Sequence, residues 1–215
     1  MSKPKPPPAD EKRIRSLLQK YNCPVPYHEV RTRFLGNIAT PAMSVSPMQI
    51  VKGLWGGELP EFDSLDAVNA LIGALVNGLW NSLTRHQKRS DPFRLTSASS
   101  EPTRAGIAAY TLMRREEIDG FIKGLFNGQD DIDLPEKARA SLGAIAELRA
   151  MLAGVHALTL DETKVASEAE FATTLKLIRE MTPIIEREVN TIVMACTRAR
   201  RQMLQYPDFS GPTIH

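Results

Sequence analysis

The chain has 215 residues, of which 42% are hydrophobic and 24% charged, and its formal net charge is +2. This balance is typical of a globular protein and excludes a disordered chain, while two cysteines are too few for a disulfide scaffold. The 15 prolines are unevenly spaced. Because proline breaks a helix interior, long helices are predicted in the proline-free stretches, which are residues 61–91, 103–134, 136–182 and 184–206.

The start of the chain predicts a tail followed by three short helices. Residues 1–9 are rich in lysine and proline, and we expect them to be disordered. Asp10 can cap a first helix, and a second is expected from about Tyr27 to Ala39. Ser46–Gln49 has the pattern of a capping box with proline at the first helical position, and Gly56-Gly57 would end the helix that it opens.

Residues 64–84 carry one of the two most regular patterns, with apolar side chains every three or four positions. Within them, Ala67–Thr84 is uncharged, but it holds three asparagines and is short for a membrane span, so we expect a buried helix and no membrane association. A stripe of small residues runs beside the apolar positions and would let another helix approach closely. Its members are Ala67, Ala70, Ala74 and Gly78.

The second half predicts one long connection and three further helices. Residues 85–102 are polar, and we expect a surface segment that Phe93 and Leu95 hold down. The next helix should end at Asn127-Gly128.

The two helices after that should open at capping-box patterns. These patterns are Asp133–Glu136 and Ser167–Glu170. The apolar stripe of the last helix includes the stretch 185–203, and Pro183 should kink or restart this helix. Residues 207–215 should be extended.

No segment alternates at period two, so we predict an all-α multihelical bundle of about seven to eight helices. We expect one helical domain over residues 10–206. A division into two helical subdomains, 10–128 and 134–206, is the alternative.

Patterns for catalysis and metal binding are missing from the sequence. No serine sits in a nucleophile elbow, and there is no C-x-x-C or H-x-x-x-H spacing. Asp131 could begin a calcium loop, but its sixth position would be Glu136 where an EF-hand needs glycine. We therefore expect no enzyme activity, no cofactor and no metal. The four histidines are His28, His86, His156 and His215.

Charge is unevenly distributed along the chain. Glu58–Asp66 holds four acidic residues and no basic one. A basic set at both ends supports a hypothesis of polyanion binding, although a solvated helix surface explains it as well. Its members are Lys12, Arg13 and Arg15 near the start, and Arg198, Arg200 and Arg201 in the last helix.

Trp55 and Trp80 are the only tryptophans, and each ends or interrupts an apolar helical stripe, which is typical of a core position. The alternative is a partner-binding groove between their two helices. We assign to this candidate contact the two tryptophans together with Ala70, Ala74 and Gly78, and the 185–203 stripe is a second candidate.

Several segments together point to a known family. Phe34–Pro41 reads FLGNIATP, and Ser46–Gly57 follows as a proline-started segment that ends in Leu-Trp-Gly-Gly. With Asn69–Leu83, Glu117–Leu125 and Glu186–Cys196, this layout resembles the YecA/YgfB-like family of small bacterial proteins. The family tryptophan before Gly-Phe is replaced by Glu117 or Ile118, and the cysteine-rich zinc tail of some members is absent.

The resemblance implies an all-helical cytosolic bacterial protein, often dimeric, with no established enzymatic activity and no catalytic residues to transfer. Our leading hypothesis is a non-enzymatic protein-binding or regulatory module that acts through helix surfaces in the cytoplasm, with a second copy or another protein as the expected partner. One alternative is association with nucleic acid or the ribosome through the basic residues. Another is an uncharacterised enzyme with a cleft near Trp55, His86 or His156.

Overall fold

The computed structural model describes residues 9–41 and 46–205, and the structural statements below concern these residues. They are mostly helical and include no strand, which confirms the all-α prediction. If the continuous helical stretch from Leu65 to Gln87 is counted as one, they form seven helices. Apart from Ala9, the predicted tails over residues 1–9 and 207–215 lie outside the described residues.

The helices follow one another in a simple order. They are α1 (Ala9–Lys20), α2 (Tyr27–Ala39), α3 (Pro47–Gly53), α4 (Leu65–Ile72), the π-helical η1 (Gly73–Trp80), α5 (Asn81–Leu83), the 3₁₀ helix η2 (Thr84–Gln87), α6 (Arg104–Phe126), α7 (Glu136–Leu160) and α8 (Glu168–Gln205).

Two of the helix ends follow the predicted chemistry. At the start of α8, Ser167 Oγ accepts a hydrogen bond from the Glu170 amide at 3.3 Å, and Glu170 Oε2 accepts one from the Ser167 amide at 2.7 Å. This is the reciprocal capping box that the sequence predicted. At the end of α6, Asn127 takes a left-handed conformation with φ 49°, which stops the helix where predicted.

The other two predicted capping boxes are wrong. α3 begins at Pro47, but its N-cap residue Ser46 makes no side-chain capping bond. The Asp133 box requires Asp133 to be the N-cap of α7, whereas Pro135 occupies that position and Glu136 is the first helical residue. The fixed φ of Pro135, −52°, orders the entry to α7 without a side-chain cap.

The last helix continues through Pro183, where a kink or a restart was predicted. α8 includes Pro183 in its interior and does not restart there. Proline removes one helical donor, and polar contacts to α6 hold the adjacent turn. Tyr110 Oη and Thr182 Oγ1 share a hydrogen bond of 2.6 Å, and Arg114 Nε donates to Thr182 Oγ1 at 3.2 Å.

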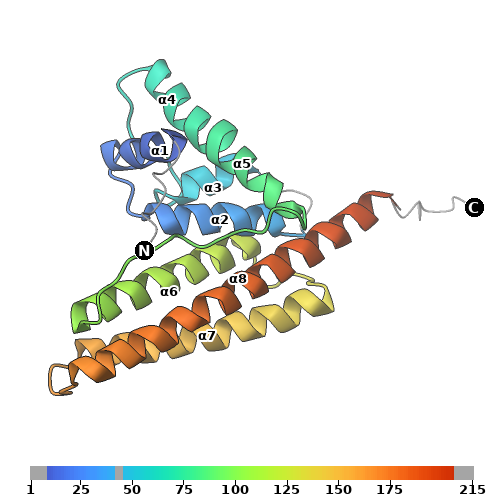
Figure 1. The fold of residues 1–215 in the computed structure, drawn as a ribbon. Helices are drawn as coiled ribbons and strands as arrows, with labels where there is room; N and C mark the ends of the chain where they lie inside the picture. The colour runs from blue at the N-terminus through green and yellow to red at the C-terminus, as the bar shows by residue number, and fades with distance from the viewer. Residues whose placement is uncertain (1–8, 42–45, 206–215) are drawn as a thin grey trace, which may run out of the picture.

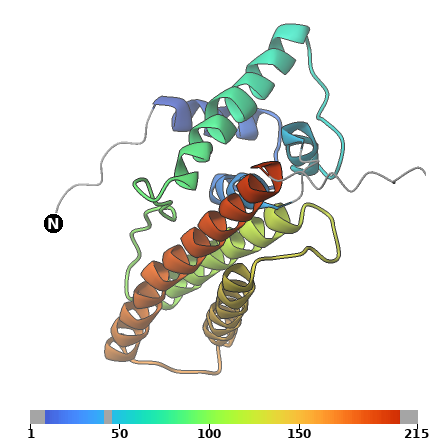
Figure 2. The same cartoon turned by 90° about the vertical axis from the view of Figure 1, so that its right-hand side faces the viewer.

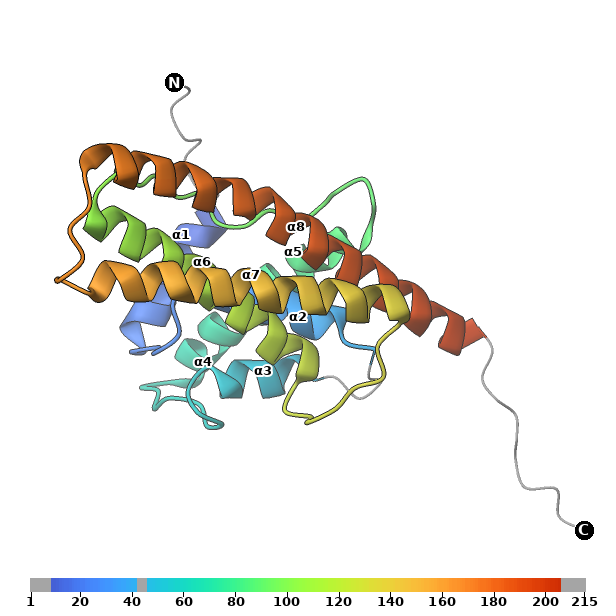
Figure 3. The ribbon, with the colours of Figure 1, turned by 90° about the horizontal axis from the view of Figure 1, so that it is seen from below.

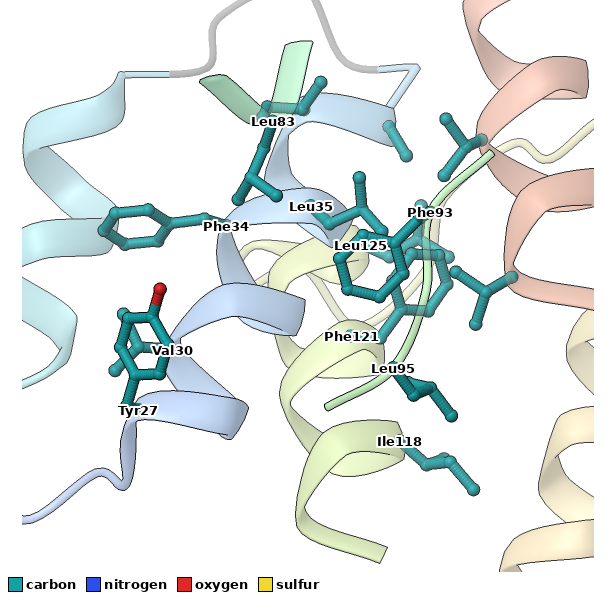
Figure 4. Packing of buried hydrophobic residues seen from close by; sticks show 14 of the residues in the cluster. Tyr27, Val30, Phe34, Leu35, Leu83, Phe93, Leu95, Ile118, Phe121 and Leu125 are labelled. Carbon is teal, nitrogen blue, oxygen red and sulfur yellow. The ribbon is translucent and has the colours of Figure 1, made fainter. Parts of the chain in front are cut away.

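The helices form a layered bundle. Figure 1 shows α6, α7 and α8 side by side, with α2 packed on α6 and the α4–α5 stretch on the far side of α2. α6 packs against both α2 and α7, so it links the two halves of the chain. In Figure 4, Phe93 from the connection after η2 lies beside Phe121 and Leu125 of α6, and Phe93 and Leu95 are both buried as predicted.

The tightest helix contact made by glycines lies outside the predicted stripe. Gly78 is half-buried, and a β-carbon on it would meet only the carbonyl oxygen of Gly73, at 3.7 Å. The tight contact lies instead between α2 and α6, at Gly36, Gly120 and Gly124. A β-carbon on Gly120 would lie 2.7 Å from atoms of α2. The spacing Gly120-x-x-x-Gly124 puts both glycines on one helix face, and this is the sequence signal that would have located the contact.

Candidate binding groove

Both tryptophans hydrogen-bond to neighbouring parts of the fold. Trp55 Nε1 donates a hydrogen bond to the Tyr21 carbonyl at 2.8 Å, and Trp80 Nε1 donates to Asn37 Oδ1 at 3.2 Å. Both rings are half-buried and pack against the core. Their polar atoms thus tie their own helices to the bundle, as buried indoles usually do. Of the small residues grouped with them, Ala74 is buried and Ala70 is half-buried.

The basic residues of the two chain ends do not meet. Figures 1 and 3 show α1 and the end of α8 on different sides of the molecule. On α1, Arg15 is engaged by Glu11 at 2.8 Å, while Lys12 and Arg13 are exposed. On α8, Arg200 donates to the Thr40 carbonyl at 3.3 Å and Arg201 is exposed. A single patch built from both ends is therefore wrong. The buried face of the 185–203 stripe is covered by this chain's own core as far as Cys196.

A groove of about 980 Å³ lies between α8 and two other segments. One wall is the connection after η2, the other is the start of α7, and the outer side of α8 runs between them. Sequence reasoning identified Arg198 as basic but missed its neighbours in space. The charged lining residues are Lys88, Arg89, Arg94, Glu136, Lys137, Glu186, Arg187 and Arg198.

One α8 residue fixes the first wall. Asn190 Nδ2 donates to the Phe93 carbonyl at 3.0 Å, and Asn190 Oδ1 accepts from the Phe93 amide at 2.8 Å. One turn earlier, Glu186 Oε1 accepts from the Leu95 amide at 2.9 Å, and its other oxygen accepts from Arg94 at 2.6 Å. These bonds satisfy backbone groups of a segment that forms no helix. They also hold the Lys88–Arg94 wall beside α8.

The groove is strongly positive. Six lysines and arginines line it against two glutamates, although the whole chain carries a net charge of only +2. Arg94 is paired with Glu186 at 2.6 Å and Arg187 with Glu188 at 2.8 Å. Within the described part of the chain, the other four basic side chains of the groove form no ion pair, and all four are exposed. They are Lys88, Arg89, Lys137 and Arg198.

Between the basic side chains, the groove has apolar lining. Met194, Ala195 and Ala199 come from α8, and three prolines contribute from the surrounding segments. Among residues 9–41 and 46–205, the only aromatic side chain that lines the groove is that of His86. An apolar lining inside a basic rim suits a segment that carries both acidic and apolar side chains. The prolines are Pro92, Pro135 and Pro183.

His86 is the buried histidine of the groove. It is 5% exposed, its Nδ1 lies 2.8 Å from the Asp91 carbonyl oxygen, and its ring meets the Phe93 ring edge-on at 5.3 Å between centroids. Burial lowers the pKa of His86, so its ring is neutral near pH 7. Thr191 also lines the groove, and its hydroxyl donates a hydrogen bond to the Arg187 carbonyl at 2.9 Å.

Of the residues that the structure describes, neither a serine nor a cysteine lines the groove. His156, the other histidine of the enzyme hypothesis, lies 3.3 Å from Thr111 Oγ1 between α7 and α6. No group of three histidine, cysteine or acidic side chains that could hold a metal ion occurs among residues 9–41 and 46–205. The arrangement of the groove thus offers charge and apolar surface for binding.

α7 exposes a second apolar surface. By length and composition alone it could cross a membrane, a test that the core helices of many globular proteins also pass. Only 11% of its most apolar stretch is buried, and Met151 and Leu158 are more than half exposed. Figure 3 shows α7 running along the outside of the three-helix layer.

Comparison with known proteins gives no relative for this fold or this groove: no family model, curated protein or solved structure matches the chain. The YecA/YgfB-like resemblance stays a prediction based on the residues quoted for it. Several of those residues, Gly36 on α2 and Gly120 and Gly124 on α6, meet at the close helix contact.

Proposed function

We propose that this protein is a non-enzymatic binding protein whose basic groove takes an acidic, partly apolar segment of a partner protein. The observation that carries the proposal is the pairing of a rim of basic side chains with an apolar lining in one groove. Opposite charges steer the partner to the groove, and buried apolar contacts supply affinity. A cytoplasmic bacterial setting, expected from the sequence, belongs to the same proposal.

A protein segment suits the groove better than nucleic acid does. Single-stranded nucleic acid is usually held by aromatic rings on which its bases stack, together with basic residues along its backbone. Here the basic residues are present, but the space between them is lined by Met194, alanines and prolines. A phosphate backbone would leave this apolar surface uncovered, whereas leucine-like side chains would bury it.

Fluorescence anisotropy with a short labelled peptide of alternating glutamate and leucine tests the proposal. We expect binding by the native protein, and binding at least about tenfold weaker, equal to about 1.4 kcal/mol, in the double variant Lys88→Glu/Arg198→Glu. The matched control is Lys12→Glu/Arg13→Glu, which makes the same charge change on exposed residues of α1. This control should bind the peptide as the native protein does.

The same titration includes a labelled single-stranded oligonucleotide. Tighter binding of the oligonucleotide than of the peptide would replace the proposal with the nucleic-acid alternative. An equal loss of peptide binding in the groove variant and the α1 variant would place the contact outside the groove and contradict the proposal. Binding of neither probe would also contradict it.

A further inference from the structure

One exposed segment of the chain has the chemistry that the groove requires. Residues 58–66 comprise the last part of the connection from α3 and the first two residues of α4, and they hold four acidic residues and no basic one. All four acids are exposed, and within the described residues none of them forms an ion pair. The four are Glu58, Glu61, Asp63 and Asp66.

The acidic segment also has an ordered apolar part. Leu59 and Phe62 are half-buried and pack against the core, and the Phe62 ring lies 4.9 Å from the Tyr21 ring, centroid to centroid. These contacts hold the segment on the protein surface with its carboxylates outward. Leu65 is the exception among the apolar residues, because it is 74% exposed and stands between Asp63 and Asp66.

We infer that residues 58–66 of a second copy of this chain occupy the basic groove. The inference rests on the proposed function and names its partner. The segment presents an exposed leucine flanked by acids, and the groove presents apolar lining flanked by basic side chains. Leu65 would fill the groove beside Met194, while the acids would face Lys88 and Arg198. Charge complementarity of this kind fixes which surfaces meet.

The two surfaces lie on different sides of one molecule. Figures 1 and 3 show the connection between α3 and α4 well away from the C-terminal half of α8, which points toward the viewer in Figure 2. Because Phe62 anchors the segment beside Tyr21, the contact forms between copies and not within one. Each copy then keeps a free groove at one side and a free segment at the other. Such a head-to-tail contact adds further copies unless the assembly closes into a ring.

Sedimentation velocity over a range of protein concentrations tests the inference. The native protein should gain mass as its concentration rises, and should lose this tendency at high salt. Two neutralised variants should stay monomeric over the same range. They are the segment variant Glu61→Gln/Asp63→Asn and the groove variant Lys88→Gln/Arg198→Gln.

An equimolar mixture of the two variants gives the sharpest result. The segment variant keeps an intact groove and the groove variant keeps an intact segment, so the mixture should form a one-to-one dimer and grow no further. The matched control Glu162→Gln/Glu180→Gln removes two exposed acids elsewhere and should associate like the native protein. A monomeric native protein, or association that both variants retain, would overturn the inference.

A peptide of residues 58–66 separates the two proposals. If it binds the groove of a native protein that stays monomeric, the inference about a second copy is wrong and the proposed function stands. If neither this peptide nor the glutamate–leucine peptide binds, the proposed function itself is wrong.

Discussion

Gly36 of α2 lies against the backbone of α6 so closely that a β-carbon on it would be 2.7 Å from the Leu125 amide nitrogen. Gly124 makes the same contact from the other helix, since its β-carbon would be 2.8 Å from the Arg33 carbonyl carbon. Real β-carbons do not approach backbone atoms this closely. The crossing of α2 and α6 therefore requires glycine on both sides.

We predict that Gly124→Ala destabilises the protein by at least about 1–3 kcal/mol, the usual cost of overpacking a tight contact. Gly154→Ala is the matched control, because Gly154 also lies inside a long helix but has nothing within 4 Å. That change should stabilise the protein by up to about 1 kcal/mol through helix propensity. Urea unfolding measures the free energy of unfolding of both variants. Equal changes in Gly124→Ala and Gly154→Ala would contradict the tight contact between α2 and α6.

The buried ion pair of α6 yields a second prediction. Arg114 and Glu117 form a hydrogen-bonded ion pair, and their side chains are 4% and 0% exposed. Glu117 also accepts from the Thr96 amide at 2.7 Å, and Arg114 donates to the Thr96 carbonyl at 2.8 Å. Glu117→Ala leaves a buried guanidinium unpaired and should lower the free energy of unfolding by about 3–5 kcal/mol.

The effect of Glu117→Ala can be compared with that of breaking an exposed ion pair of similar helical spacing, the pair formed by Glu11 and Arg15. Glu11→Ala removes the partner of Arg15 on α1, where the side chains are 23% and 45% exposed. Its expected cost is below about 0.5 kcal/mol, as for other exposed i,i+4 pairs. A small effect of Glu117→Ala, close to that of Glu11→Ala, would show that Arg114 finds solvent in the folded protein.

His86 gives a pH-dependent prediction. Burial lowers its pKa below the ordinary value of 6.5. Between the lowered pKa of His86 in the folded protein and its ordinary pKa in the unfolded chain, the unfolded chain binds more protons. The stability that neutral His86 contributes is therefore complete above pH 6.5 and is lost as the pH falls through the lowered pKa. His86→Asn should remove this part of the slope when the free energy of unfolding is measured between about pH 5 and 7.5. An unchanged slope would contradict the assignment.

The two cysteines should differ in reactivity. Burial raises the pKa of the Cys196 thiol to about 11, and the residue is 0% exposed. Burial also raises the pKa of Cys23, which remains half-exposed. A thiol reagent at pH 8 should therefore modify Cys23 alone in the folded protein, slowly, and both thiols after unfolding. Modification of the folded variant Cys23→Ser would contradict this order.

Local signals in the sequence predicted much of the fold and little of the groove. Pro47, the Ser167 capping box and Asn127 act on their own neighbours, so their effects are visible in sequence. The groove joins Lys88, Lys137 and Arg198, which are far apart along the chain and meet only because Asn190 and Glu186 hold one wall. No periodic pattern encodes such a meeting.

The two small-residue patterns make the same point. A close helix approach is compatible with either pattern, the stripe that ends at Gly78 or the Gly120–Gly124 pair. The sequence alone does not decide which of the two another helix covers. In the folded chain, α2 covers Gly120 and Gly124, whereas no described side chain presses on Gly78. Long-range packing makes that choice.

Hydrogen–deuterium exchange, with and without the glutamate–leucine peptide, tests the proposed groove most directly, because it locates the contact. We expect slower exchange in residues 86–94 and along 183–202 of α8 when the peptide is bound, and unchanged exchange in α1. Protection confined to α1, or peptide binding that leaves exchange in both groove segments unchanged, would show that the groove is not the binding site.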